Sequence, residues 1–388
     1  MEFIEKIKRY IYRKFVSYYN IDPSKKVIYN LNIDICKEQK RLAFVYLNSL
    51  YDKPYTNQVY HVNRIHIYQL LLPFINMGYV IDIYPAEYLH EDDIYDIKYD
   101  VIFGFGPTYM KLITNNPNAL KILFITENAP WVVREKFAER LDWYKERTGK
   151  FPQYARSRTN FYVDEMFSLS DYGISINGTN NISSMLSKLR PIYQLNVNAL
   201  YGKHKDINKD HKRTRRKFLW FGSTGAIHKG LDLLVEVFRR LPEYQLDVYG
   251  ANQLELKDME LPSNIVICNK INVLSERFID EVVNEHSYVI SLSCSEGMQS
   301  SIATCMMYGL IPIVSNETGY DDNPYAIIPE SYDINQIMSV IKKCASTSSE
   351  ELLKLEHDVM RFASSHYTIE QFTETYNQII TKIFQHDF

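Results

Sequence analysis

The sequence predicts an α/β protein built from two Rossmann-like domains, each with a doubly wound parallel sheet. Short apolar runs alternate with helix-length segments along most of the chain. Residues 288–315 have the pattern of strand, polar loop, helix, glycine and second strand, which is typical of a βαβ unit with buried strands. The composition changes abruptly at residues 201–217, where eight Lys or Arg stand against two Asp, so we expect the two domains to meet there.

Composition limits the class of protein. A chain of 388 residues is long enough for two domains with buried cores, and 46% of its residues are hydrophobic. The net charge of −3 gives no general attraction to nucleic acid. The five cysteines are odd in number and lack CxxC spacing, which argues against a disulfide framework or a zinc site and favours a reducing cytoplasm. The sequence has no run of 18 apolar residues and no secretory signal pattern, so we expect no transmembrane helix.

Residues 2–19 predict a basic amphipathic helix, because apolar side chains recur at helical spacing with lysines and arginines between them. Two interpretations of this helix are open. It can lie on an anionic lipid surface, which would place the protein at the inner face of a membrane. Alternatively, it can dock on its own domain with a solvated basic face.

The first domain is expected to span residues 1–205. Apolar runs bounded by polar turns predict its strands, and longer periodic segments predict its helices. The predicted strands are residues 41–48, 78–84, 99–104, 120–126 and 172–176. The predicted helices are residues 58–76, 131–147 and 159–171, with a further helix beginning near Gly178.

A basic linker at residues 206–216 and a second domain at residues 217–366 follow. We interpret the linker as solvated, with a position near anionic phosphate or lipid as the alternative. The predicted strands of the second domain are residues 217–221, 246–250, 264–268, 288–292, 310–315 and 325–329. The predicted helices are residues 231–241, 275–284, 300–309 and 334–344, and a last helix at 367–384 lies within a C-terminal segment, residues 367–388.

Glycines and polar residues follow the predicted strands of the first domain. Ligands of open α/β sheets bind beyond the carboxyl ends of the strands, so this rim is a candidate acceptor surface. Glu127 is the candidate for contact with an acceptor or a sugar, and the alternative is an acid that favours the N-terminus of the next helix. The other candidates at this rim are Asn57, Gly104, Gly106 and Asn128.

Two loops of the second domain are predicted to bind anions. Residues 222–230 (GSTGAIHKG) connect a strand to a helix, whose first-turn N–H groups lack an acceptor, and Lys229 adds a point charge. Residues 293–300 also connect a strand to a helix, and Gly297 would let the backbone approach a ligand closely. Glu296 is unexpected beside an anion, so we infer that it faces a neutral, hydroxyl-rich part of the ligand.

These motifs resemble the donor site of retaining GT-B glycosyltransferases of the family 4, or group 1, type. The resemblance is carried by Glu296-Gly297, the following helix, Gly309 and residues 311–315, and by the loop that ends in Lys229. The sequence departs from the family pattern in two donor positions. Thr304 stands where the family has a second Glu, and Ser223 stands where it has an Arg.

The resemblance implies a GT-B fold with a deep cleft between the domains and a C-terminal helix that crosses back onto the first domain. It implies a metal-independent hexosyltransferase, without a cofactor, that moves a sugar with retention from a nucleotide-sugar to a glycan or lipid-linked glycan acceptor. Such enzymes would serve bacterial-type surface polysaccharide synthesis in the cytoplasm. Catalysis would fall to Glu296 and Lys229. The implied donor-binding residues are Gly222, Ser223, Thr224, Gly225, Lys229, Asn269, Ile271, Gly297, Met298, Gln299, Ser300 and Thr304.

Three other classes of function stay open. A catalytically weak nucleotide-sugar binder or assembly scaffold is motivated by Ser223 and Thr304. A nucleotide-sugar epimerase would need further acids near Glu296, and the sequence places none there. A nicotinamide dehydrogenase would need a GxGxxG loop after its first strand, which neither residues 49–57 nor residues 222–230 provide.

Overall fold

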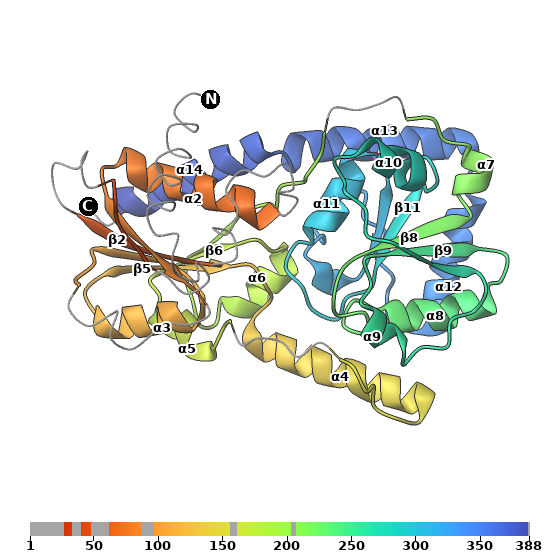
Figure 1. Cartoon of the computed structure of the whole chain (residues 1–388), viewed down its shortest axis with the longest axis horizontal. Coiled ribbons are helices and arrows are strands. Elements are labelled where there is room, and N and C mark those ends of the chain that lie inside the picture. Colours follow the sequence, from red (N-terminus) through yellow and green to blue (C-terminus); the bar gives the residue numbers. More distant parts are fainter. Residues whose placement is uncertain are drawn as a thin grey trace, which may run out of the picture.

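The computed structural model describes residues 27–32, 40–47, 62–86, 97–155, 161–202 and 207–386. It contains two parallel sheets that lie side by side, each covered by helices (Figure 1). The first sheet has seven strands in the order β1-β3-β2-β4-β5-β6-β7, and only β1 is antiparallel to its neighbour. The second sheet has five parallel strands in the order β10-β9-β8-β11-β12. The predicted fold class is therefore confirmed.

The elements of the first half alternate between strand and helix. The strands are β1 (Ile28–Leu31), β2 (Arg41–Tyr46), β3 (Val80–Pro85), β4 (Val101–Gly104), β5 (Leu120–Ile125), β6 (Tyr172–Ser175) and β7 (Ile192–Gln194). The helices are α2 (Val62–Asn76), α3 (Gly106–Asn115), α4 (Pro130–Thr148), α5 (Asp164–Leu169) and α6 (Thr179–Met185). Almost every strand residue of β2, β3 and β4 is buried, as a sheet covered on both faces requires.

The second half repeats this alternation. Its strands are β8 (Lys217–Phe221), β9 (Gln245–Tyr249), β10 (Ile265–Cys268), β11 (Tyr288–Ser291) and β12 (Ile311–Val314). Its helices are α7 (His211–Thr214), α8 (Leu231–Arg240), α9 (Gln253–Leu256), α10 (Glu276–Phe278), the π-helical turn η4 (Ile279–Val283), α11 (Ser300–Met307), the 3-10 turn η5 (Asn316–Thr318), α12 (Ile334–Ser346), α13 (Ser349–His366) and α14 (Ile369–His386).

Several predicted elements differ from the structure. Residues 325–329 do not form a strand, because only Ile327 makes a bridge, to Ile313 of β12. The predicted helix 159–171 is helical only from Asp164, and the helix predicted at 275–284 is a short α-helical turn that continues as a π-helix. No element was predicted at the positions of β1, β7, α3, α7, α9, η5 or α13. Most of these are short, and a short apolar run does not distinguish helix from strand.

The described part of the segment 206–216 is only partly exposed to solvent, and two of its cations are paired with acids. The Lys209 side chain is 1% exposed, and its Nζ lies 3.0 Å from a carboxylate oxygen of Glu356 in α13. Arg213 in α7 donates two hydrogen bonds of 2.6 Å to the carboxylate of Glu285. Lys209 and Arg213 are thus paired with acids of the second half of the chain, and α7 packs against α13 and β8.

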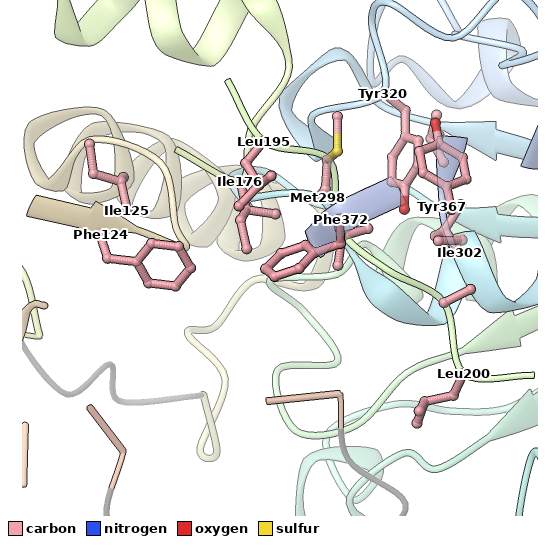
Figure 2. Close-up of a cluster of buried hydrophobic side chains, with 14 of the residues drawn as sticks. Phe124, Ile125, Ile176, Leu195, Leu200, Met298, Ile302, Tyr320, Tyr367 and Phe372 are labelled. Carbon is pink, nitrogen blue, oxygen red and sulfur yellow. The ribbon is translucent and has the colours of Figure 1, made fainter. Parts of the chain in front are cut away.

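The C-terminal helix α14 lies against α2 of the first domain (Figure 1). The hydroxyl of Tyr376 donates to the carbonyl of Leu70, at 3.1 Å. Where the domains meet, one apolar cluster continues from the first into the second, and Figure 2 shows Ile176, Met298 and Phe372 close together in it. The domains are therefore joined by packed side chains, as well as by the segment after β7 and the C-terminal helix α14, which both run between them.

None of the helices in the described ranges is long and apolar enough to cross a bilayer. The predicted amphipathic helix at residues 2–19 lies outside the described residues.

Candidate active site

A cavity of about 500 Å³ lies between the two domains. Both domains line it, so the site depends on how they are held together. Some lining residues come from the first domain and from the crossing segment, which follows β7 and leads to the second domain. These are Leu47, Phe105, Thr126, Glu127, Phe161, Tyr162 and Leu200. Those from the second domain are Phe221, Gly222, Ser223, Lys229, Ile271, Val273, Glu296, Met298, Gln299, Ser300, Ser301 and Thr304.

Lys229 and Glu296, the two predicted catalytic residues, meet at this cavity. The loop after β8 positions Lys229 and the loop after β11 positions Glu296, and their side chains form a hydrogen-bonded ion pair. The side chains are only 11% and 13% exposed. His228 Nε2 lies 3.2 Å from the same Glu296 carboxylate oxygen. A charge pair this shielded from water is electrostatically stronger than one on the surface.

The charges around the cavity bear on which ligand fits. Among the described lining residues, Glu127, Lys229 and Glu296 carry charge, so the lining has one cation and two carboxylates. A diphosphate would therefore compete with Glu296 for Lys229. Among the described residues, no group of three or more His, Cys, Asp or Glu is placed to hold a metal ion.

The N-terminus of α11 faces the cavity through Ser300 and Ser301. The N-cap residue, Gln299, makes no side-chain cap hydrogen bond. Its side-chain Nε2 instead donates to the hydroxyl of Ser293, at 2.8 Å. The first-turn N–H groups of a helix have no acceptor within the helix, so this end of α11 is suited to bind an anion.

In the loop at residues 222–230, two backbone N–H groups that could bind an anion are already hydrogen-bonded within the protein. The carboxylate of Glu255, which is 5% exposed, accepts hydrogen bonds of 2.9 Å and 3.1 Å from the backbone N–H groups of Gly225 and Ala226. The predicted anion cradle is thus filled by an acid of the protein itself. Gly225 and Thr224 do not line the cavity, and their role as donor contacts stays a prediction. Gly222, Ser223 and Lys229 of this loop do line it.

Gly297 lies directly against the backbone of the first domain. A Cβ atom at this position would lie 2.4 Å from the carbonyl oxygen of Thr126 and 2.8 Å from that of Ile176. The adjacent N–H of Met298 donates to Ile176, at 3.0 Å. The close approach that requires glycine is therefore to the backbone of the first domain, and Gly297 does not line the cavity.

On the acceptor side, Glu127 lines the cavity and Asn128 does not. Asn128 is 3% exposed and donates to Asn181, at 2.8 Å. Gly104 and Gly106 have positive φ and pack against the backbones of Val45 and Ala86, so both are packing positions. Asn57 lies outside the described residues.

The remaining donor candidates divide in the same way. Ile271 lines the cavity, whereas Asn269 is exposed and does not. Thr304 lines it at 3% exposure, and its hydroxyl accepts a hydrogen bond of 3.0 Å from the N–H of Leu200, in the segment that crosses between the domains. The threonine hydroxyl is thus partly used to hold this crossing segment.

Sequence reasoning missed several residues of the site. Phe105, Phe161 and Tyr162 form an aromatic wall, with the Phe105 and Tyr162 ring centroids 5.4 Å apart. Burial raises the pKa of Tyr162, so its hydroxyl stays protonated and donates to the carbonyl of Phe124. No spacing pattern separates these aromatic residues from the other tyrosines and phenylalanines of the chain. His228 was also missed, although it precedes Lys229 directly.

Two Rossmann-like domains that share a cavity and are joined by a C-terminal crossing helix define a GT-B fold. The solved structures with the same fold agree. Sucrose-phosphate synthase from Thermosynechococcus elongatus has a TM-score of 0.60 and 10% identity, covering 90% of this chain and 100% of that one. WaaG, a glycosyltransferase involved in lipopolysaccharide biosynthesis, has a TM-score of 0.54 and 13% identity, covering 88% and 99%. The Anabaena protein HepE, solved with UDP and glucose, has a TM-score of 0.54 and 9% identity, covering 89% and 100%.

Similarity at the level of sequence covers a smaller part of the chain. No family model matches the chain. A stretch of 131 residues, 32% of the chain, is 27% identical to the GtfA subunit of the UDP-N-acetylglucosamine–peptide N-acetylglucosaminyltransferase of Streptococcus parasanguinis. That match spans about a quarter, 26%, of the relative's length.

Proposed function

We propose that this chain is a glycosyltransferase that moves a sugar from a nucleotide-sugar to a glycan or lipid-linked glycan acceptor. The observation that carries the proposal is the cavity between the domains, where Lys229, Glu296 and the N-terminus of α11 come together. The fold shared with WaaG and with the UDP-bound HepE supports it. The similarity to an N-acetylglucosaminyltransferase subunit makes UDP-N-acetylglucosamine the first donor to test.

The proposed mechanism uses the charges of the cavity. Departure of the sugar builds negative charge on the leaving diphosphate, which Lys229 and the N–H groups of Ser300 and Ser301 would stabilise more strongly in the transition state than in the ground state. Glu296 would accept hydrogen bonds from sugar hydroxyls once the diphosphate has drawn Lys229 away. Retention of configuration, with the leaving phosphate taking the acceptor proton, and independence of metal are parts of the same proposal.

Replacing Glu296 by glutamine tests the proposal. The change keeps the size of the side chain and removes the carboxylate that now holds Lys229. We expect transfer from the nucleotide-sugar to fall by about 10²-fold, as for other preorganised polar groups of active sites. UDP should bind at least as tightly as to the wild type, because Lys229 becomes available. Release of free UDP and calorimetric titration with UDP measure the two effects.

Glu243→Gln is the matched control, since Glu243 is exposed and does not line the cavity. A Glu296→Gln protein that transfers sugar at the wild-type rate contradicts the role of Glu296. One that loses UDP binding together with transfer shows that Glu296 contacts the nucleotide or supports the loop.

A catalytically weak nucleotide-sugar binder or scaffold is the second candidate function. Ser223 in place of an arginine and the Glu255 carboxylate on the Gly225 loop both reduce the positive charge open to a diphosphate. A panel of nucleotide-sugars, assayed for release of nucleoside diphosphate with and without acceptor extracts, separates the two candidates. Binding of UDP without any turnover over the panel favours the scaffold.

Replacing Thr304 by glutamate tests which way this position faces. If residue 304 faces the donor ribose, a carboxylate there adds charge-assisted hydrogen bonds, and we expect UDP to bind about tenfold more tightly. Thr304→Val is the control, because it removes the acceptor of the Leu200 N–H without adding a ligand contact. The control should lose about 1–3 kcal/mol of unfolding free energy and gain no affinity. Equal or weaker UDP binding by the glutamate protein would mean that residue 304 serves only the crossing segment.

The contact of residues 2–19 with an anionic membrane surface also remains a proposal, which rests on the basic amphipathic pattern of this segment.

A further inference from the structure

The helix α4 follows a strand of the first domain and contacts the second domain along its length. It begins at Pro130, five residues after β5, and runs 19 residues to Thr148. Figure 1 shows α4 extending beneath the boundary between the domains toward α8 and α9. The hydroxyl of Tyr144 donates to the carbonyl of Asp258, at 2.9 Å, and Arg147 pairs with Asp232 of α8. The first domain thus reaches the side of the second domain that supports the donor loops.

Arg140, in the middle of α4, is fully buried. Its Nη1 donates to the carbonyl oxygen of Ile227 at 3.2 Å, and its Nη2 donates to the carbonyl oxygen of Leu292 at 3.0 Å. The same guanidinium lies 4.5 Å from the ring centroid of Tyr332, and its Nη1 is 3.7 Å from a carboxylate oxygen of the buried Asp232. A buried guanidinium is costly unless its donors are paired, and the planar fork of arginine fits two acceptors at once.

The two carbonyl groups belong to the loops of the candidate active site. Ile227 lies two residues before Lys229, and Leu292 lies four residues before Glu296. The loops are also joined directly, because the N–H of Cys294 donates to the carbonyl of His228 at 2.9 Å. Arg140 therefore bridges the two loops at their bases, away from the cavity, which it does not line.

Two further contacts lead from α4 to the same loops. The ring of Phe137 lies 5.8 Å from that of His228, whose Nε2 is 3.2 Å from Glu296. Tyr332, under the Arg140 guanidinium, donates to the carbonyl of Ser293 at 2.6 Å. One face of α4 thus supports the residues that hold the Lys229 and Glu296 pair.

We propose that Arg140 is a positioning residue, which fixes the two donor loops of the second domain from a helix of the first domain. The cavity would then keep its donor geometry only while α4 stays docked, so the two domains act as one unit in donor binding. The structural part of this inference is independent of ligand. Its consequence for nucleotide binding rests on the proposed function.

Hydrogen–deuterium exchange of the free protein tests the structural part. In Arg140→Met the carbonyls of Ile227 and Leu292 lose the hydrogen bonds from the guanidinium, although Ile227 keeps the one from the N–H of Gly230. We expect amides of residues 225–231 and 292–298 to exchange about tenfold faster, the factor for one lost hydrogen bond. Arg134→Gln is the matched control, because it lies on the same helix, is exposed, and pairs with Asp164 of the first domain without touching either loop. Arg140→Lys keeps the charge without the fork and should show the same local effect more weakly.

Calorimetric titration with UDP tests the consequence. Arg140→Met should weaken UDP binding by about tenfold in the wild-type background and by less than about twofold in the Lys229→Ala background, because Arg140 would act through Lys229. Equal losses in both backgrounds would overturn this coupling. Unchanged exchange, or exchange raised uniformly over the second domain, would overturn the positioning role. If the wild type does not bind UDP, the proposed function fails while the exchange result still decides the role of Arg140.

Discussion

Replacing Lys229 by alanine is expected to lower turnover by about 10²-fold or more while the protein stays folded, since one charged donor to a developing negative charge is worth about 3–4 kcal/mol. Lys229 is the one cation among the described residues that line the cavity. Its loss leaves Glu296 with His228, at 3.2 Å, so the carboxylate keeps a buried partner and the loop keeps an anchor. Steady-state release of nucleoside diphosphate measures the effect.

Lys270→Ala is the control for this experiment, because Lys270 is exposed and lies beside Ile271 without lining the cavity. Activity of Lys229→Ala within about threefold of the wild type would remove Lys229 from the site. A large loss of thermal stability in Lys229→Ala would instead show that its pairing with Glu296 is structural.

Replacing Gly297 by alanine is expected to have the second large effect, through the contact between the domains. The new methyl group would lie 2.4 Å from the Thr126 carbonyl oxygen, which belongs to backbone and cannot rotate away. Either the loop after β11 or the end of β5 must shift, and a displacement of about 1 Å in an active site can lower turnover by about 10²-fold. Overpacking of this kind also costs about 1–3 kcal/mol of folding stability.

Hydrogen–deuterium exchange and turnover together measure this prediction. The amide of Met298 should exchange faster than in the wild type, because the shift weakens its 3.0 Å hydrogen bond to the carbonyl of Ile176. Gly202→Ala is the control, since a Cβ there meets nothing closer than 3.8 Å. Unchanged exchange together with full activity would mean that the interface yields without moving the site.

Much of the fold follows from local patterns along the chain. Buried apolar runs at β2, β4 and β5 in the first half and at β8 and β11 in the second, alternating with helix-length segments, were sufficient to predict two Rossmann-like domains. The residues at the ends of those strands were predicted to be functional because parallel strands bring their carboxyl ends to one edge. Lys229 and Glu296, in the loops after β8 and β11, lie at the cavity for this reason.

Only the tertiary structure decided what the polar and small residues of these loops touch. Gly225 faces Glu255 and Gly297 faces Thr126, although glycine in a loop looks the same in sequence whether it admits a ligand or another part of the chain. Arg140 is one of many charged residues in α4, and its burial depends on the docking of two domains that local sequence does not encode. The sequence by itself determined which loops after the strands carry polar and charged residues suited to a site. The choice between ligand contact and internal contact was made by long-range packing, because both use the same N–H groups, carboxylates and small side chains.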